Sequence, residues 1–224
     1  MTTNATLRSK DAKSLTPPRI LDVALQLVQE DGIDFSMRDL AARLDVWPMA
    51  IYRHFENRDA LVEAIVEAVL REALDEDTLA RLADEEKSWQ LRLTDFALRL
   101  YDVLVTYPGI SKIITYGVLH TPSGLRLIET VADFLVSIGV REERAAIMFQ
   151  TAAFFVAEMA SLQYAREQGS TDLKGFADRA EAARDEFPKA HNYIQHFVGE
   201  DLRERLIKSL QLLFRAVEAE IAGG

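Results

Sequence analysis

The segment from Ser36 to Leu61 concentrates side chains that carry positive charge or donate hydrogen bonds. They are Arg38, Arg43, Arg53, His54 and Arg58. Arginine matches phosphate oxygens and the N7 and O6 acceptors of guanine with bidentate geometry. The residue types therefore predict a surface that contacts nucleic acid. The alternative is an ordinary solvated face of an amphipathic helix.

Two short helices with a break between them must position these side chains. Leu40, Ala41 and Leu44 recur at helical spacing before the break, and Ile51 and Phe55 do so after it. Each helix therefore has one narrow apolar face. Because both faces share one core, the helices must cross at an angle, and the small side chain of Ala41 permits a close crossing.

The ends of both helices carry their own signals. Ser36 is a good N-cap for the first helix, and Asp39 adds negative charge near the positive end of the helix dipole. Residues 45–47 form the break, and Pro48 suits the first position of a second helix. The polar side of that second helix then faces outward, as in a helix-turn-helix that places its second helix in the major groove.

This pattern resembles the tetracycline-repressor (TetR) family of bacterial transcription regulators. The matching residues are Ser36, Arg38, Leu40, Ala41, Leu44, Val46, Ile51, Tyr52, Phe55 and the basic residue before Leu61. Upstream, residues 20–28 and Gly32 look like the family's first helix and its glycine stop. The resemblance is strong over about residues 18–70. It implies an all-α fold, with an N-terminal three-helix helix-turn-helix domain and a larger helical ligand-binding and dimerisation domain.

The resemblance also implies which residues bind DNA. They are Arg38, Trp47, Pro48, Met49, Ala50, Tyr52, Arg53, His54 and Arg58. Arg38 would pair with a guanine edge, and the apolar tip 48–50 would meet thymine methyl groups. Tyr52, His54 and Arg58 match the family's phosphate-contacting positions, which set orientation rather than sequence preference. Arg53 suits either role.

Two positions depart from the family's pattern. Asp45 stands at the turn where the family usually has Gly, and Asp is one of the few other residues that tolerate a positive φ. Trp47 stands where the family commonly has a Ser or Thr that caps the recognition helix. Indole supplies no acceptor for that cap. The ring therefore either stacks on the sugar-phosphate backbone or packs on the first helix.

The overall charge of −10, from 26 basic and 36 acidic residues, looks unfavourable for binding DNA. The distribution of charge is uneven, because basic residues predominate in 1–19. The acidic surplus lies in 75–86, 142–143, 181–186 and 200–204. A net-acidic protein with one cationic face binds DNA through that face. We expect residues 1–17 to be a flexible basic arm, which either contacts DNA or is simply disordered.

The length of 224 residues and the 49% hydrophobic composition allow one large or two small domains. We assign residues 18–66 to the DNA-binding domain and 67–224 to a helical effector-binding and dimerisation domain.

The absence of cysteine excludes disulfides and thiolate metal sites. The amino terminus lacks an apolar signal core, and Glu158 breaks the longest apolar run, 151–162. We therefore expect a cytoplasmic protein with no membrane partner and no cofactor.

Strand signals are nearly absent, and helical periods follow one another along the body. Apolar residues at spacings near four predict a helix from Arg58 to about Leu74, which ties the DNA-reading head to the body. Further helices are expected from Ser88 to the stop at Tyr107, and over 110–118, 121–139, 142–167 and 201–221. The stretch 169–188 is polar and poorly patterned, and 169–199 is either a lid or a connection.

The helices at 142–167 and 201–221 are more apolar than a single core stripe requires. We expect them to pair with their copies in a homodimer, as in the family, unless both faces are buried within one chain. A two-fold protein reads a palindromic operator in double-stranded DNA, with half-sites about 34–36 Å or more apart.

Aromatic and polar side chains recur in the body and are candidates for a ligand pocket. They are Phe96, Tyr101, Tyr116, His120, Phe134, Phe149, Gln150, Phe154 and Glu158. Ligand sites are mostly apolar with a few placed polar groups, but aromatic stripes at helical spacing also fill ordinary cores. His120 either orients a ligand or caps chain ends. Glu158 must be exposed, paired or ligand-facing.

These features predict a dimeric repressor that leaves its operator when a small, largely apolar ligand binds the body. The alternative is a regulator without an effector, whose body serves only dimerisation or protein contacts; a solid core would favour it. An enzyme is not expected, because HExxH, a Gly-rich phosphate loop and a nucleophile elbow are all missing. His191 and His196 have a weak metal-like spacing that is more typical of a solvated helix face.

Overall fold

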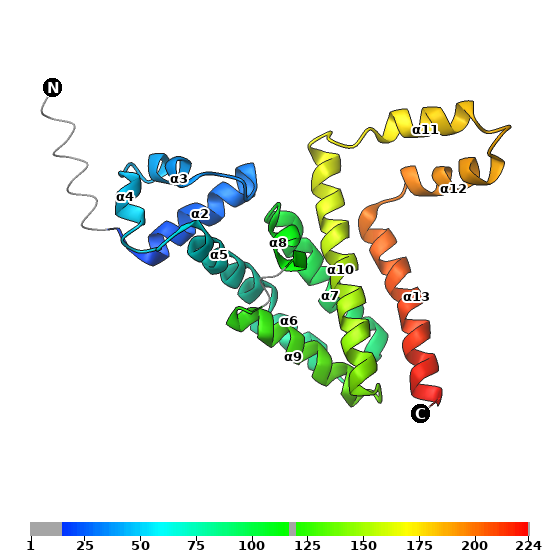
Figure 1. Ribbon diagram of the computed structural model, residues 1–224. Coiled ribbons are helices and arrows are strands. Elements are labelled where there is room, and N and C mark those ends of the chain that lie inside the picture. The colour runs from blue at the N-terminus through cyan, green and yellow to red at the C-terminus, as the bar shows by residue number, and fades with distance from the viewer. Residues whose placement is uncertain (1–14, 117–119, 224) are drawn as a thin grey trace, which may run out of the picture.

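The computed structural model describes residues 15–116 and 120–223, with the backbone alone given for 115, 116, 197 and 223. Helices are the regular structure throughout this part of the chain (Figure 1), which confirms the all-α prediction. Most of the predicted basic arm, residues 1–14, lies outside the described residues.

Three helices form the head. They are α2 (Pro17–Asp31), α3 (Met37–Arg43) and α4 (Pro48–Ile51). Ile20, Leu40 and Ile51 are fully buried, so one side chain from each helix anchors the shared core. The small side chain of Ala41 is also buried at this junction.

Capping residues mark where the head helices begin and end. The Ser36 hydroxyl accepts from the Asp39 N–H at 3.2 Å, and the Asp39 carboxylate accepts from the Ser36 N–H at 2.8 Å. The Ser36 hydroxyl also donates to the Asp39 carboxylate at 2.6 Å, and this bond, together with that from the Ser36 N–H, lowers the pKa of Asp39. Gly32 ends α2 with a φ of 80°, and Asp45 has a φ of 52° in the turn between α3 and α4. Asp45 therefore adopts the positive φ that Asp tolerates better than most residues other than Gly.

Helix α5 (Arg58–Ala73) joins the head to the body, as predicted. Asn57 caps its start by accepting from the Ala60 N–H at 2.8 Å. Leu61, Ile65 and Leu70 are fully buried, because α5 contacts α2 on the head side and α7 and α9 on the body side. A helix buried against both parts can transmit a movement of one to the other.

The body is built around one long central helix, α10 (Glu142–Glu167). It contacts α7 (Trp89–Thr106), α8 (Ile110–Tyr116), α9 (Pro122–Ser137) and α13 (Leu202–Gly223). Figure 1 shows α10 and α13 running side by side along one edge of the molecule. Ser88 caps α7, and Thr121 followed by Pro122 opens α9, both as the sequence indicates.

Three helices lie where the sequence pattern gave no helical signal. They are α6 (Glu76–Ala83), α11 (Leu173–Ala182) and α12 (Pro188–Val198). Helix α6 is short and acidic, and α11 has no buried residue. Helices α11 and α12 pack against each other and project from the end of α10 (Figure 1). The stretch 169–188, which looked irregular, is therefore partly a helical hairpin.

Helix α10 is also, by length and composition alone, apolar enough to cross a membrane. Its most apolar window has a mean hydropathy of 1.5, and 28% of that window is buried within the chain. Core helices of water-soluble proteins pass the same test. Helix α10 therefore has apolar side chains that this chain does not bury.

Candidate DNA-binding head and ligand cavity

The predicted DNA-binding residues lie on α3, from the N-cap of α4 to the turn that follows it, and at the start of α5. Trp47 and Met49 are 66% and 70% exposed at the tip of α4, where they present apolar surface to solvent. Arg38 on α3 and the pair Arg53 and His54 after α4 are also exposed. Tyr52 is exposed, while Pro48 and Ala50 are half-buried. The buried side chain of Ile51 fixes this group against the core of the head.

Trp47 is the N-cap of α4 and forms no capping hydrogen bond through its side chain. The indole therefore does not replace the hydroxyl that the family commonly has at this position. Its exposure leaves most of the ring available on the same surface as Met49. An aromatic ring and a thioether chain together form an apolar tip for the recognition helix.

Arg58 has a structural contact that its sequence pattern did not indicate. It is half-buried, and its Nη2 donates to the carbonyl oxygen of Ile33 at 2.7 Å. The start of α5 is thereby tied to the loop between α2 and α3. A phosphate contact by Arg58 would have to use its remaining N–H groups.

The head rests on the body at the turn formed by Tyr107, Pro108 and Gly109. The Ile33 N–H donates to the Pro108 carbonyl oxygen at 3.1 Å, so the backbone of Ile33 is held from both sides, by Pro108 and by Arg58. Gly109 has a φ of 85°, and a Cβ added there would lie 2.6 Å from Cγ2 of Ile33. The close approach of head and body therefore requires glycine at this position.

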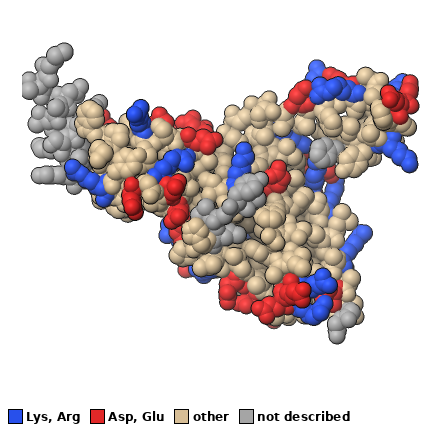
Figure 2. All heavy atoms as spheres, viewed as in Figure 1, with Lys and Arg blue, Asp and Glu red and all other residues tan. Residues whose placement is uncertain are grey.

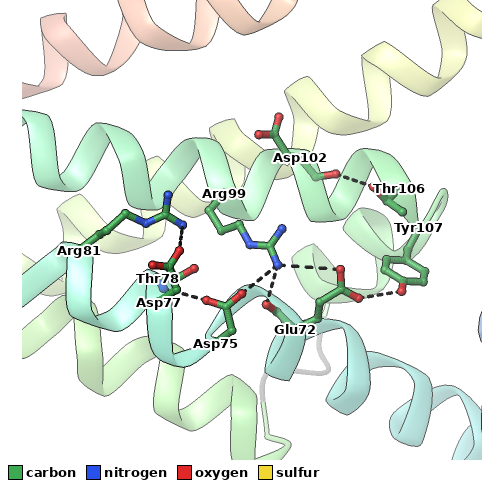
Figure 3. A network of polar contacts seen from close by, with 9 residues as sticks. All are labelled: Glu72, Asp75, Asp77, Thr78, Arg81, Arg99, Asp102, Thr106 and Tyr107. Carbon is green, nitrogen blue, oxygen red and sulfur yellow. Dashed lines mark hydrogen bonds and ion pairs between the residues drawn. The ribbon is translucent and has the colours of Figure 1, made fainter.

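Helix α7 holds the C-terminal end of α5 through Arg99 (Figure 3). Nη2 of Arg99 donates to the Glu72 carbonyl oxygen at 3.0 Å and to the Asp75 carboxylate at 3.1 Å. A guanidinium is favourable here because the carbonyl end of a helix carries partial negative charge. The pKa of Asp75 is lowered, chiefly by hydrogen bonds from Thr78 and further by Arg99.

Tyr107 adds a second connection between α5 and the end of α7. Its hydroxyl donates to the Glu72 carboxylate at 2.7 Å, as Figure 3 shows. Burial raises the pKa of Tyr107 to about 12, and the neighbouring Glu72 carboxylate adds to this effect. Gln29 of α2 also forms a hydrogen bond with this side chain. One hydroxyl thus connects the head, the linking helix and the body.

Helix α9 is attached to the middle of α5 by a buried serine. The Glu67 carboxylate accepts from the Ser123 N–H and from the Ser123 hydroxyl, both at 2.8 Å. Beside it, Nε2 of His120 lies 3.3 Å from the Glu63 carboxylate. These contacts, together with those of Arg99 and Tyr107, connect α5 to two different helices of the body.

A cavity of about 460 Å³ lies between α7, α9, α10 and α13. Its volume falls within the range of about 300–1,000 Å³ that is usual for small-molecule sites. Nearly all of the wall is apolar, and Arg144, Thr151 and Glu220 are its polar members. The remaining lining residues are Leu93, Phe96, Ala97, Leu100, Leu127, Val131, Leu135, Ile147, Met148, Phe149, Ala152, Ala153, Val156, Leu210, Leu213, Phe214, Ala216 and Val217.

Of the predicted ligand residues, Phe96 and Phe149 line this cavity. Gln150, Phe154 and Glu158 do not; they lie on the exposed face of α10. Phe154 and Glu158 lie seven residues, or about two helical turns, after Ile147 and Thr151. They therefore share a side of α10 with those two lining residues but are not part of the wall.

The other predicted ligand residues have different neighbours. Tyr101 is buried outside the cavity, and burial raises its pKa to about 12, helped by the nearby carboxylates of Asp201 and Asp102. Phe134 packs under the guanidinium of Arg92, 4.8 Å from the ring centroid. His120 faces α5 instead of the cavity, since it precedes α9 at the contact with Glu63. The side chain of Tyr116 lies outside the described part of the chain.

The sequence pattern predicted Phe96 of α7 but missed the other side chains that α7 and α13 contribute to the cavity wall. Leu93, Ala97 and Leu100 form one wall, and Leu210, Phe214 and Val217 form another. The apolar excess of α13 was a signal, but it was attributed entirely to dimerisation. Arg144 carried no signal, because an arginine in the first turns of a helix is ordinary.

The charged groups are distributed unevenly over the surface. Figure 2 shows acidic side chains gathered along the lower edge of the body, whereas acidic and basic side chains are mixed on the head. Within the described residues, no cluster of three or more His, Asp or Glu side chains is arranged to hold a metal ion.

The fold and the exposed tip of α4 define a helix-turn-helix protein with a helical ligand-binding body. Residues 20–65 match the family "Bacterial regulatory proteins, tetR family", and residues 82–221 match "Tetracyclin repressor-like, C-terminal domain". The chain belongs to the TetR family of transcriptional regulators.

Individual relatives show the same kinship. The chain is 31% identical to the tetracycline repressor protein class G of Vibrio anguillarum over 138 residues, which is 61% of this chain and 63% of that protein. An HTH-type transcriptional regulator of Saccharopolyspora erythraea is 28% identical over 134 residues, covering 59% of this chain and 54% of the relative. The chain thus spans less than two thirds of the length of these curated relatives.

Among solved structures, the TetR family protein ActR of Streptomyces coelicolor in complex with actinorhodin has a similar fold. The TM-score is 0.76 at 25% sequence identity, and the match covers 92% of this chain and 98% of ActR.

Proposed function

We propose that this chain is a dimeric repressor that leaves a palindromic operator when a small, largely apolar molecule occupies the cavity of the body. The operator-bound form would use the exposed tip of α4 and the basic side chains around it. A regulator of this kind acts in the cytoplasm, the compartment of bacterial DNA.

One observation carries the ligand-gating part of the proposal: α7 both lines the cavity and holds α5. Phe96 and Leu100 face the cavity, while Arg99 and Tyr107 of the same helix region bind the C-terminal end of α5. A ligand that displaces α7 must strain or break these contacts. The N-terminal end of α5 carries Arg58, which is bonded to the head. The same rigid helix therefore connects the cavity to the recognition surface.

Exposed apolar side chains on α10 and α13 support the proposal that the protein is a dimer. Phe154 of α10 and Leu212 of α13 are 44% and 64% exposed. Large apolar side chains grouped on two long neighbouring helices are typical of an interface, and a second copy would supply the matching surface. Two heads related by a two-fold axis suit a palindromic operator.

A solved structure of a similar protein with a bound small molecule supports the proposal that an effector binds the body. ActR, which is 25% identical in sequence, has been solved with actinorhodin. The alternative, a regulator whose body only dimerises, predicts a solid core, and a cavity of about 460 Å³ argues against it.

The test is an electrophoretic mobility shift with the DNA upstream of the protein's own gene, with and without apolar compounds first selected for binding to the purified protein. For gating, the ligand must prefer the DNA-incompetent state, with a coupling of about 1–3 kcal/mol. We expect the operator affinity to fall roughly 5- to 150-fold at saturating ligand. Unchanged DNA binding with the cavity demonstrably occupied would refute the gating and leave the DNA-binding role intact.

A further inference from the structure

We infer that the cavity accepts an apolar molecule that carries one anionic group, and that Arg144 binds this group. The inference rests on the proposed function, because it names the class of the effector. It begins from the polar side chains of the wall, which are Arg144, Thr151 and Glu220. These three are the side chains of the wall that can match a charged or hydrogen-bonding group of a ligand.

Thr151 and Glu220 already have partners. The Thr151 hydroxyl donates to the Ile147 carbonyl oxygen at 2.8 Å. The Glu220 carboxylate accepts from Nε of Arg141 at 2.9 Å, and Nη2 of Arg141 lies 2.8 Å from the same oxygen. A paired glutamate is a poor site for a cation, since a second cation would compete with Arg141 for the same charge.

Arg144 is the polar side chain of the wall whose N–H groups can still donate hydrogen bonds to a ligand. Its Nε lies 3.9 Å from the Glu220 carboxylate, which is too long for a hydrogen bond, and within the described residues it forms no hydrogen bond. Two arginines and one glutamate leave this end of the cavity with a net positive charge. The planar guanidinium matches a carboxylate or sulfonate with two parallel N–H donors. Its 51% exposed side chain can turn toward a ligand without refolding of the helix.

The shape of the site separates the two parts of such a molecule. Apart from Glu220, the side chains that α7, α9 and α13 contribute to the wall are aliphatic or aromatic. Arg144 lies in the first turn of α10, at one end of this apolar chamber. An elongated apolar ligand with an anionic group at one end therefore matches both the apolar walls and Arg144.

The protein contains its own reporter of occupancy. Trp89 stacks edge-on against Phe214, with ring centroids 5.2 Å apart, and Phe214 lines the cavity. The other tryptophan, Trp47, lies in the head, so the variant Trp47→Phe leaves Trp89 as the single tryptophan.

The experiment titrates the full chain carrying Trp47→Phe with two fluorescent probes that differ only in charge. One is 8-anilinonaphthalene-1-sulfonate, and the other is the uncharged N-phenyl-1-naphthylamine. Energy transfer from Trp89 reports binding near Phe214. We expect the anionic probe to bind at least tenfold more tightly than the neutral one. The added variant Arg144→Gln should abolish this preference while changing the affinity for the neutral probe less than about twofold.

The matched control is Arg215→Gln on α13, which removes one positive charge from an exposed position outside the cavity wall. It should retain the preference for the anionic probe, which separates a contact at Arg144 from a change in net charge. Circular dichroism checks that each variant is folded.

Equal affinities for the two probes, or a preference that survives Arg144→Gln, would overturn the inference while ligand binding itself stands. If neither probe binds, both the inference and the proposed effector site fail. The three outcomes are distinguishable within one set of titrations.

Discussion

At the scale of single residues, the contact between head and body depends on atoms that a sequence pattern does not mark. Ile33 is bonded through its N–H to Pro108 and through its carbonyl oxygen to Arg58. Gly109 permits this contact because it lacks a Cβ. A glycine in a turn between helices is common, and its neighbour across the junction is 76 residues away in sequence, which is why only the folded chain reveals the pairing.

Replacing Gly109 tests this junction. The variant Gly109→Ala must adopt a positive φ, which costs about 1–2 kcal/mol, and must also push Ile33 aside, which costs about 1–3 kcal/mol more. We expect urea unfolding to show a combined loss of about 2–5 kcal/mol in the free energy of unfolding. The control is Gly169→Ala, where φ is 63° and a Cβ would meet nothing within 4 Å. Equal losses in the free energy of unfolding for the two variants would show that the clash with Ile33 does not contribute to the destabilisation.

A second prediction at this scale concerns Arg38, which is exposed on α3. If Arg38 reads a guanine, Arg38→Ala should weaken operator binding by about 1–3 kcal/mol, roughly 5- to 150-fold, with little effect on nonspecific DNA. Fluorescence anisotropy at fixed salt measures both affinities. Arg43→Ala is the comparison, because Arg43 is engaged in an ion pair with Glu30. A parallel loss on both kinds of DNA for Arg38→Ala would identify a phosphate contact instead.

At the scale of elements, capping and packing explain which helices are visible in the sequence. Helices α3, α7 and α9 are capped by Ser36, Ser88 and Thr121, each of whose side chains accepts from the backbone N–H three residues further on. Such signals are local, so they are readable in advance. Helices α11 and α12 are short, 10 and 11 residues, and pack mainly on each other, so the polar composition of this region hid them.

The junction between α5 and α7 leads to a prediction about alkaline stability. The folded state raises the pKa of Tyr107 from 10 to about 12, so it favours the neutral phenol. The resulting stabilisation is present in full below pH 10 and is lost as the pH rises from 10 to 12. We expect Tyr107→Phe to reduce the fall in the free energy of unfolding over this interval, measured by urea titration at several pH values. The decline should not vanish, since the pKa of Tyr101 is raised in the same direction.

The control for this experiment is Tyr193→Phe, because Tyr193 is 72% exposed on α12, far from α5 in sequence and packing. It should leave the pH dependence as it is in the unmodified protein. An identical slope in Tyr107→Phe and the unmodified protein would show that the buried hydroxyl and Glu72 do not contribute to the alkaline transition.

At the scale of the whole molecule, the distribution of apolar surface predicts how two copies associate. Leu212 lies on α13 and is 64% exposed, and Leu125 on α9 is exposed to a similar degree, 57%. If α10 and α13 form the interface, Leu212→Asp buries a charge in the dimer and should yield monomers at micromolar concentration. Leu125→Asp should remain dimeric. Sedimentation velocity distinguishes the two.

The same pair of variants tests the operator symmetry. A monomer contacts one half-site, so Leu212→Asp should bind the full operator only as weakly as a single half-site. Leu125→Asp should bind like the unmodified protein. A Leu212→Asp protein that stays dimeric would place the interface elsewhere and would leave the exposed face of α10 for another partner.

The sequence by itself determined the helical class, the helix-turn-helix and most helix boundaries. These follow from interactions between residues three or four positions apart: capping at Ser36, the proline at position 48, and the apolar periods of α5 and α10. Such interactions are complete within one segment, so the order of residues is enough to predict them.

The tertiary structure decided where the cavity lies and how it connects to the head. Phe96 and Phe214 both line the cavity although 118 residues separate them, and Arg144 lies beside Glu220 of another helix. The aromatic pattern predicted Phe154 and Glu158 as ligand residues, but both are exposed and neither is part of the cavity wall. Which side chains of α10 line the cavity depends on the packing of α7, α8, α9 and α13 around it, which no single segment encodes.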